Sequence, residues 1–254
     1  MKPVHEIKRD VVRICRNVDQ RQYVGGRDGN LSVRVSDSAI VVTPAGMRKG
    51  DVEATDLVIV DREGKRLEGR RNASSELGMH LRIYDLREDV RAIVHAHPPV
   101  ATGFAAAGIE MSECVLPEVI VGLGRVPLAR YAAPGTPELS ASLDPVIADH
   151  DAWLLENHGA VTVGTDIDDA YQRMETVEHA ARILLVARLL GGPNPLSPSS
   201  VAELVAARPR YGVREDLAAC VLGEKDPLVA EIVRRVRARV DRPGGPAEPS
   251  GGDH

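Results

Sequence analysis

Two histidines stand two positions apart in His95-Ala96-His97, at the end of a short apolar run, and this pair could bind a metal ion. On a β-strand, residues two apart point to the same face, so both imidazoles can reach one metal. His158 also follows an apolar run, and the glycine after it permits close backbone approach, so it is a candidate third imidazole. Glu76, at the expected start of a helix, would add a carboxylate. Three histidines and one carboxylate suit Zn²⁺ best, with Mn²⁺, Fe²⁺ or Co²⁺ as alternatives.

The same residues also have a purely structural interpretation. Histidines of such a pair can instead be hydrogen-bonded near a sheet edge, and an isolated His158 would be structural. His80 lies one helical turn after Glu76 on the same face, where a packed or hydrogen-bonded role is favoured over ligation. The other histidines have no partner in the sequence and are expected on the surface: His5, His150, His179 and His254.

Two segments have the composition of anion-binding sites. Residues 25–32 are rich in glycine, which lets backbone N–H groups approach an anion, and Asn30 adds an amide donor. Ser74 and Ser75 are expected at a helix N-terminus, where free N–H groups, the helix dipole and two hydroxyls favour a phosphate. The alternatives are a plain loop between helix and strand, and a plain helix cap. Because Glu76 directly follows Ser75, a metal and an anion would lie side by side.

The elements that must position these side chains follow from the apolar pattern. Helices are expected at residues 4–19, 76–86, 99–107, 137–150 and 166–190, the second of them capped by a serine. Strands are expected at residues 31–35, 39–43, 56–61, 91–97, 126–129, 152–155 and 160–163. The pattern predicts one mixed α/β domain over residues 1–240. A tail rich in proline, glycine and serine at 241–254 is expected to be disordered.

The composition argues against several classes of function. The 254 residues include 32 Lys and Arg against 37 Asp and Glu, and a net charge of −5 does not suit a coat for nucleic acid or an anionic membrane. One Trp, five Tyr and one Phe are too few for a base-stacking surface. Three cysteines without a CxxC pair argue against a disulfide framework and favour a reducing cytoplasm. The sequence shows no apolar run long enough for a membrane span and no signal-peptide core, so no export is expected.

Six short motifs occur in a fixed order along the chain: GNLS (29–32), TPAG (43–46), SSE (74–76), HAHP (95–98), YAAPGT (131–136) and ENHG (156–159). In this ordered set, over residues 1–213, the chain resembles the class II aldolase/adducin family, typified by L-fuculose-1-phosphate aldolase. The resemblance implies a three-layer αβα fold around a mostly antiparallel sheet. It also implies a homotetramer with active sites between subunits.

The resemblance also implies roles for individual residues. Zinc would be held by Glu76, His95, His97 and His158, and as a Lewis acid it would stabilise the enediolate that carbon–carbon cleavage leaves behind. Glu76 would also serve as acid and base once substrate displaces it from the metal. The resemblance assigns the substrate's phosphate to Asn30, Gly46, Ser74 and Ser75, and Gly29 of the glycine-rich loop is a further candidate for binding it.

Four further positions bear on the substrate. Ala45 stands where the fuculose enzyme has a phosphate-binding threonine, and Pro134 stands where it has a phenylalanine of the aldehyde pocket, so the aldehyde preference is open. Glu118 stands where that enzyme has a tyrosine proton donor that reaches across the interface. An epimerase and a dehydratase of the family have acids at similar positions, so Glu118 is a candidate general acid or base, or else a solvated acid. Tyr211 resembles a C-terminal tyrosine supplied by a neighbouring subunit, or is a packed lone aromatic.

The favoured function is a zinc-dependent aldolase that cleaves a ketose 1-phosphate into dihydroxyacetone phosphate and an aldehyde. The alternative is an epimerase, dehydratase or hydroxy-acid decarboxylase of the same family that uses Glu118. A non-catalytic, adducin-like interaction module is disfavoured because all four metal-ligating positions are filled. A metallohydrolase on a (β/α)₈ barrel is disfavoured because the strands of residues 31–61 have no helices between them.

Overall fold

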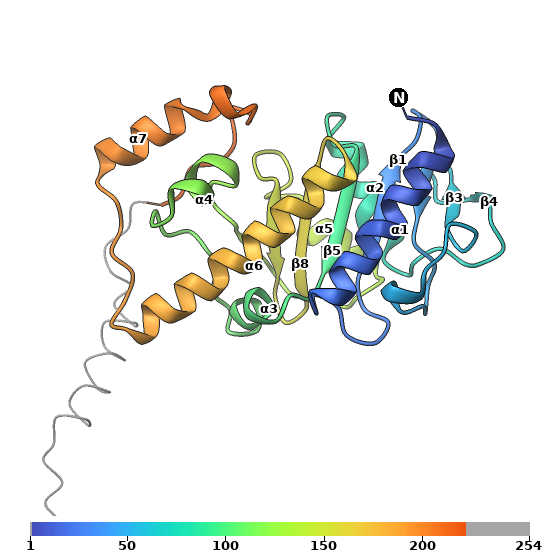
Figure 1. Cartoon of the computed structure of the whole chain (residues 1–254), viewed down its shortest axis with the longest axis horizontal. Helices are drawn as coiled ribbons and strands as arrows, with labels where there is room; N and C mark the ends of the chain where they lie inside the picture. The colour runs from blue at the N-terminus through green and yellow to red at the C-terminus, as the bar shows by residue number, and fades with distance from the viewer. Residues whose placement is uncertain (1, 222–254) are drawn as a thin grey trace, which may run out of the picture.

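The computed structural model describes residues 2–221 of the chain (Figure 1). Within this range the strands form an eight-stranded sheet in the order β4-β3-β2-β1-β5-β8-β7-β6. The strands are β1 Asn30–Arg34, β2 Ile40–Val42, β3 Val58–Val60, β4 Arg66–Glu68, β5 Ala92–Ala96, β6 Leu128–Ala129, β7 Ala152–Leu155 and β8 Gly159–Gly164. Neighbouring strands run antiparallel except for the parallel pair of β6 and β7. The mostly antiparallel sheet expected from the sequence is confirmed.

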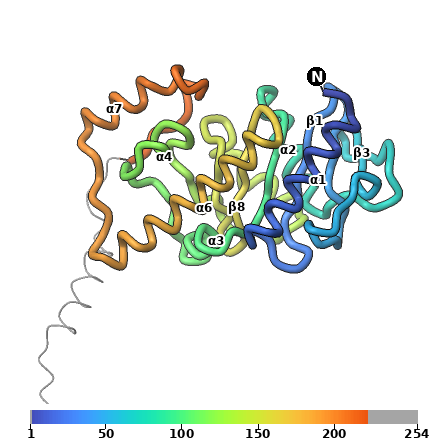
Figure 2. The backbone as a smooth tube through the Cα atoms, in the orientation of Figure 1, coloured from blue at the N-terminus to red at the C-terminus, as the bar shows by residue number. Residues whose placement is uncertain are grey.

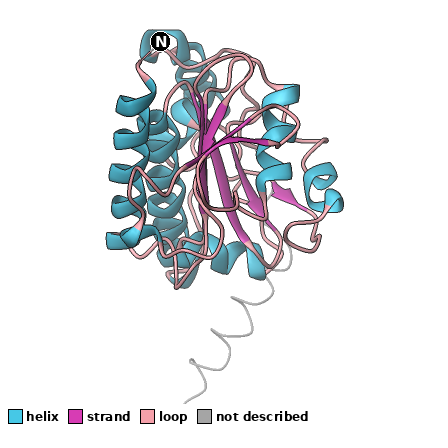
Figure 3. Cartoon of the chain, turned by 90° about the vertical axis from the view of Figure 1, so that its right-hand side faces the viewer, coloured by secondary structure: helices cyan, strands magenta, loops and turns pink. Residues whose placement is uncertain are grey.

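Helices cover both faces of this sheet, which gives the three-layer αβα fold (Figure 3). The helices are α1 Val4–Gln20, α2 Leu77–Leu86, α3 Pro99–Ala106, α4 Pro117–Gly122, α5 Pro137–Ser142, α6 Ile167–Leu189 and α7 Pro198–Ala206, with 3₁₀ turns η1 Lys49–Asp51 and η2 Arg208–Tyr211. The backbone trace shows α1 lying beside α6, and these two helices pack together with α3 against one face (Figure 2). Helices α2 and α5 pack against each other and the opposite face.

The central strand β5 is buried on both faces, because each face has its own apolar core. Ala92, Val94 and Ala96 pack into the core under α1, α3 and α6. Ile93 packs into the core under α2 and α5. Since side chains alternate along a strand, His95 points to the same side as Ile93, toward the layer of α2. The alternation of side chains therefore decides which face of the sheet the His95 imidazole lies on.

Two sequence-based expectations about helices are wrong. The helix expected at 137–150 ends at Ser142, because Pro145 cannot continue a helix and the chain makes turns instead. The expectation that a serine caps α2 is also wrong. Glu76 occupies the N-cap position without a side-chain bond, and the Ser74 hydroxyl accepts a hydrogen bond from the Glu76 N–H at 3.3 Å. The sequence pattern also missed β4, α4 and α7.

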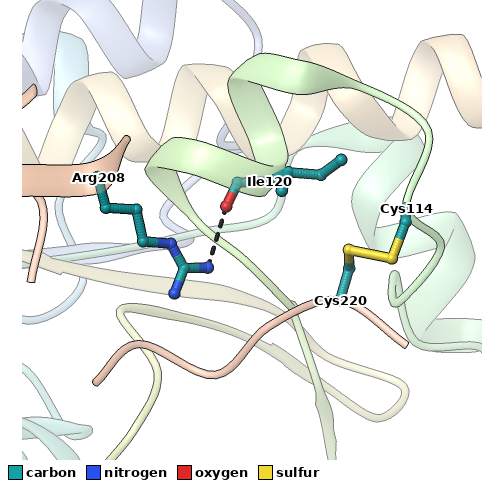
Figure 4. Close-up of a disulfide and its surroundings, with 4 residues drawn as sticks. All are labelled: Cys114, Ile120, Arg208 and Cys220. Carbon is teal, nitrogen blue, oxygen red and sulfur yellow. Dashed lines mark hydrogen bonds between the residues drawn. A yellow bond between two sulfur atoms is a disulfide. The ribbon is translucent and has the colours of Figure 1, made fainter. Parts of the chain in front are cut away.

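A disulfide joins Cys114 to Cys220, with 5.3 Å between their Cα atoms (Figure 4). The cysteine count argued against a disulfide framework, and the structure has this one link between two of the three cysteines. The two residues are 106 positions apart, so no local spacing indicates that they meet. Beside them the buried guanidinium of Arg208 donates to the Ile120 carbonyl at 3.0 Å, which ties η2 to α4 (Figure 4). Cys15 remains a free, buried thiol.

Three of the histidines expected on the surface lie in the described range. His5 and His179 are exposed, as expected. His150 is buried, and its Nδ1 lies 3.0 Å from the Val146 carbonyl oxygen, so this expectation is wrong. His254 and the tail at 241–254 lie outside the described residues. Among the described helices, none is long and apolar enough to span a bilayer.

Candidate metal centre

Three imidazoles converge at one end of β5. His95 is on the strand, His97 follows its last residue, and His158 lies in the turn between β7 and β8. The antiparallel pairing of β5 with β8 places Ala96 opposite Ala160, which brings the His158 turn next to His97. The three ring centroids lie 4.8–5.0 Å apart, and one nitrogen of each ring lies within 4.8 Å of the others.

Two glycines make this close approach sterically feasible. A Cβ at Gly159 would lie 2.5 Å from Cδ2 of His97, so any larger residue would displace that imidazole. Gly29 has φ +73°, and a Cβ there would lie 2.8 Å from the carbonyl oxygen of His95. Both glycines of the ENHG and GNLS motifs are therefore required by the packing around the histidines.

Glu76 completes the cluster from the N-cap of α2. Its Oε2 lies 3.3 Å from Nε2 of His95, and its Oε1 lies 3.3 Å from Nε2 of His158. Asn30, directly opposite His95 on β1, donates its amide N–H to Oε2 at 2.7 Å. Burial opposes ionisation of Glu76, but the two histidines and the amide together hold the pKa of its carboxyl below the ordinary value. The residue is a carboxylate at neutral pH.

The histidines have free ring nitrogens to offer as ligands. Nδ1 of His95 lies 2.9 Å from the Ala160 carbonyl oxygen, which can only accept, so Nδ1 carries a proton and Nε2 is the ring nitrogen turned toward the cluster. Nε2 of His97 faces this atom at 3.2 Å. Burial, with the nearby His95, lowers the pKa of His97 to about 3 and that of His158 to about 4, so both are neutral at pH 7.

This donor set fits a divalent metal ion. Oε1 of Glu76 is buried and has no hydrogen-bond partner among the described residues, so the cluster offers an uncompensated acceptor. Three imidazoles and one carboxylate are a set that zinc prefers. The sequence-based set of Glu76, His95, His97 and His158 is thus brought together by the fold.

The two segments expected to bind an anion also lie beside the TPAG turn, whose Gly46 the resemblance assigns to the phosphate. Two hydrogen bonds of 3.0 Å join Thr43 to Leu31: the Thr43 N–H donates to the Leu31 carbonyl, and the Leu31 N–H donates to the Thr43 hydroxyl. On its other side the Thr43 carbonyl accepts the Ser74 N–H at 3.2 Å, and Ala45 N–H donates to the Asn72 carbonyl at 3.0 Å. Gly46, at φ +68°, and Ser75 are exposed next to these bonds.

Lys49 was not anticipated from the sequence. Its side chain is 1% exposed, and its ammonium donates to the carbonyls of Met47 at 2.8 Å and Arg27 at 3.3 Å. It therefore ties the glycine-rich loop before β1 to the TPAG turn. Burial lowers the pKa of this ammonium. Its only signal in the sequence is a lysine three residues after TPAG, which is indistinguishable from a surface lysine.

Two pockets reach this cluster from outside. One, of about 760 Å³, is lined by His97, Asp28, Gly25 and Arg48 among others. A second, of about 480 Å³, is lined by Ser75, Glu76, Gly135 and Thr136 among others. His97 and Glu76 are thus accessible to a small molecule.

Glu118 and Tyr211 are not part of the cluster within one chain. Glu118 is exposed in the first turn of α4, and Tyr211, in η2, is 72% exposed. In residues 2–221 neither side chain has a hydrogen bond or ion pair, although η2 packs on α4. Their side chains are free to contact another molecule.

Comparison with known proteins gives the same family as the motifs. The family model of the class II aldolase and adducin N-terminal domain matches residues 9–185. An L-fuculose phosphate aldolase of Methanococcus maripaludis strain C5 is 34% identical over 180 residues, which cover 71% of this chain and 96% of the relative. A 3-oxo-tetronate 4-phosphate decarboxylase of Escherichia coli K12 is 30% identical over 206 residues, covering 80% of this chain and 95% of the relative.

The fold agrees with that result. A solved structure of an L-fuculose 1-phosphate aldolase superposes with a TM-score of 0.74 at 28% identity, over 82% of this chain and 96% of that one. The family match, the shared sheet and the gathered histidines and glutamate lead to one conclusion. The chain is an enzyme of the class II aldolase and adducin family.

Proposed function

We propose that this enzyme is a zinc-dependent aldolase that cleaves a ketose 1-phosphate to dihydroxyacetone phosphate and an aldehyde. The observation that carries the proposal is the adjacency of a three-histidine, one-carboxylate cluster to exposed Gly46 and Ser75. The similarity to L-fuculose phosphate aldolases supports it. The identity of the aldehyde is left open by Ala45 and Pro134.

Zinc would be held by His95, His97, His158 and, before substrate binds, Glu76. When bound, it would supply a Lewis acid that draws electron density from the substrate's carbonyl. The Glu76 carboxylate gives the cluster a negatively charged oxygen to offer to the cation, and His97 and His158 are neutral at pH 7.

The protein must move two protons during cleavage. One leaves the hydroxyl on the carbon that becomes the aldehyde, and one returns to the carbon left behind. We assign the second transfer to Glu76, because its Oε1 has no hydrogen-bond partner while Asn30 fixes Oε2. We assign the first to Glu118 or Tyr211 of a neighbouring subunit, because both are exposed and available for an intermolecular contact. A homotetramer with active sites between subunits, in the cytoplasm, is part of this proposal.

The phosphate would bind where three segments meet. The N-terminus of α2 supplies backbone N–H groups and a favourable dipole beside the hydroxyls of Ser74 and Ser75. Gly29 and Gly46 let the backbone approach closely on the other side. One N–H of the Asn30 amide is used by Glu76, and the second remains available as a donor.

A second candidate is the decarboxylation of a phosphorylated 3-oxo acid. It is favoured by the similarity to 3-oxo-tetronate 4-phosphate decarboxylase and by the carboxylic acid at Glu118. Both reactions break a carbon–carbon bond next to a carbonyl, so the same metal-ligating residues would serve either one.

One panel separates the two candidates. Zinc-loaded protein is given the 1-phosphates of fuculose, rhamnulose, ribulose and 5-deoxyribulose, and dihydroxyacetone phosphate is measured. In parallel it is given 3-oxo-tetronate 4-phosphate, and carbon dioxide is measured. Release of dihydroxyacetone phosphate that stops on chelation supports the aldolase. If only carbon dioxide is released, the decarboxylase replaces the aldolase. If the zinc-loaded protein releases neither product, both candidates are contradicted.

A further inference from the structure

A continuous line of five buried polar side chains runs between α2 and β1 and ends at the Glu76 carboxylate. In order, the members are Tyr84, Ser32, His80, Asn30 and Glu76. The distances along the line are 2.9 Å from Tyr84 Oη to Ser32 Oγ, 2.6 Å from Ser32 Oγ to His80 Nδ1, 2.6 Å from His80 Nε2 to Asn30 Oδ1, and 2.7 Å from Asn30 Nδ2 to Glu76 Oε2. All five residues are buried, and Ser32 and His80 are completely inaccessible.

The line exists because two periodicities match. Glu76, His80 and Tyr84 are four residues apart along α2, which is about 6 Å of rise per step and keeps them on one face. Asn30 and Ser32 are two residues apart on β1, which is about 6.7 Å and also keeps them on one face. The strand residues therefore fit between successive helix residues. The buried polar groups are satisfied by each other across the layer boundary.

The chemistry of the groups fixes the direction of every bond in the line. The Glu76 carboxylate can only accept, so the Asn30 amide donates to it and turns its oxygen the other way. That oxygen can only accept, so His80 carries its proton on Nε2. A neutral His80 then has a lone pair on Nδ1, which accepts from the Ser32 hydroxyl. Complete burial lowers the pKa of His80 to about 3, which keeps the ring neutral.

We propose that His80 is a positioning residue for Glu76, acting by locking the side-chain amide of Asn30 in the single orientation that donates to the carboxylate. If the Nε2–H were lost, the Asn30 amide could turn over and present its oxygen to Oε2, where two acceptors would repel. Oε1 would then no longer be held toward His158. The inference deepens the proposed function, because it concerns the residue assigned there as metal ligand and proton carrier.

Two substitutions of similar size separate the two ring nitrogens of His80. In His80→Gln the side-chain amide can place an N–H near the position of Nε2, so the donor to Asn30 is kept and the contact with Ser32 is lost. In His80→Asn the shorter amide places its oxygen near the position of Nδ1, so the contact with Ser32 is kept and the donor to Asn30 is lost. Each variant thus loses one buried hydrogen bond, and only one of them releases Asn30.

The experiment measures zinc affinity by competition with a chromophoric chelator, together with the visible absorption of the cobalt-substituted protein. We expect His80→Asn to weaken zinc binding about 10–100-fold and to change the cobalt spectrum, with His80→Gln much closer to wild type. In turnover, His80→Asn should lower kcat more than it raises KM. Thr162→Val serves as the control, because it removes a buried hydroxyl that bonds to Ala170 in α6 on the other face of the sheet.

Urea unfolding of the metal-free variants shows whether a loss follows stability alone. Equal zinc affinities in His80→Asn and His80→Gln, or losses that track stability as in Thr162→Val, overturn the inference. If His80→Asn does not fold, Ser32→Ala tests the same line from its other end. It removes only the contact with Nδ1 and keeps the donor to Asn30, so its zinc affinity should stay close to wild type, and a loss of about 10-fold or more at unchanged stability overturns the inference as well. Zinc affinity can be measured without substrate. If the variants show this pattern of zinc affinities but the wild-type protein releases no dihydroxyacetone phosphate, only the proposed function is contradicted.

Discussion

The side-chain amide of Asn30 donates to the carboxylate of Glu76, with 2.7 Å between Nδ2 and Oε2. The substitution Asn30→Leu, which keeps a similar size but removes the polar atoms, leaves buried polar groups of Glu76 and His80 without partners. We expect the free energy of unfolding to fall by about 1–3 kcal/mol and zinc affinity to weaken. Urea denaturation and chelator competition measure the two effects. An Asn30→Leu protein as stable as wild type would contradict the importance of this bond.

The side chain of His97 is 23% exposed, against 9% for His158 and 0% for His95, so its removal should disturb the fold least. We expect His97→Ala to lose bound metal and turnover while it keeps its thermal unfolding temperature in the metal-free form. His179→Ala, at an exposed position of α6, is the matched control and should keep both. Metal content after gel filtration, measured by mass spectrometry, checks this. Full metal content in His97→Ala would remove this residue from the ligand set.

Glu118 is exposed on α4 and should act on a neighbouring subunit's substrate. We expect Glu118→Gln to lower kcat about 100-fold or more while zinc content is unchanged, because it removes an acid–base group and not a ligand. Glu203→Gln, an exposed acid on α7, should have wild-type turnover. Steady-state kinetics on the zinc-loaded proteins decide this, and equal turnover in the two variants would return Glu118 to the class of solvated acids.

Burial of neutral His80 should make stability depend on pH. The unfolded chain protonates this histidine below its ordinary pKa of 6.5, whereas in the folded chain its pKa is lowered to about 3. The unfolded state therefore binds the extra proton between these values, and the free energy of unfolding falls as pH falls through this window. One proton contributes a slope of about 1.4 kcal/mol per pH unit. His80→Gln, metal-free, should show a slope smaller by this amount in urea titrations, and identical slopes would contradict it.

The disulfide between Cys114 and Cys220 closes a long loop, and such links stabilise mainly by limiting the unfolded chain. We expect reduction to lower the free energy of unfolding by about 2–4 kcal/mol. Thermal unfolding with and without a dithiol reductant measures this. The double variant with serine at both positions should unfold like the reduced protein and should not respond to reductant. A wild-type protein that is also unresponsive would show that the bond does not form in solution.

The sequence predicted the parts of the fold that depend on local pattern. β7 begins and ends at Ala152 and Leu155 as expected, and the sheet has the expected mostly antiparallel pairing. The helix expected over 137–150 ends at Ser142, because Pro145 cannot continue it, and this limit is a local one that the sequence itself contains. The disulfide could not have been predicted, because its cysteines meet only through tertiary packing of the segment after η2 against the loop before α4.

The candidate site shows the same division between features that follow from local sequence pattern and features that depend on tertiary packing. The strand period and the motif series pointed to His95 and His97 together, and the fold brings His158 and Glu76 to them. The hydrogen-bonded role favoured for His80 is confirmed, but its partners Ser32 and Asn30 are 48 and 50 residues away and could not be named from the sequence. The bond of Lys49 to the Arg27 carbonyl, 22 residues away, likewise has no local signature. His150 was placed on the surface for the same reason, because burial of a lone histidine depends on what packs over it.

The covalent link between Cys114 and Cys220 also changes what a cut in the backbone does. Everything from α4 to η2 lies on a closed ring of chain, including β7, β8 and the long helix α6. A protease that cleaves the exposed turn around Gly191 opens this ring but does not produce two separable pieces. The nicked protein keeps its mass on a non-reducing gel and separates into two bands only after reduction. In the intact protein, His158 inside the ring is attached to His95 and His97 outside it by two independent covalent routes, so a single cut within the ring always leaves one of them.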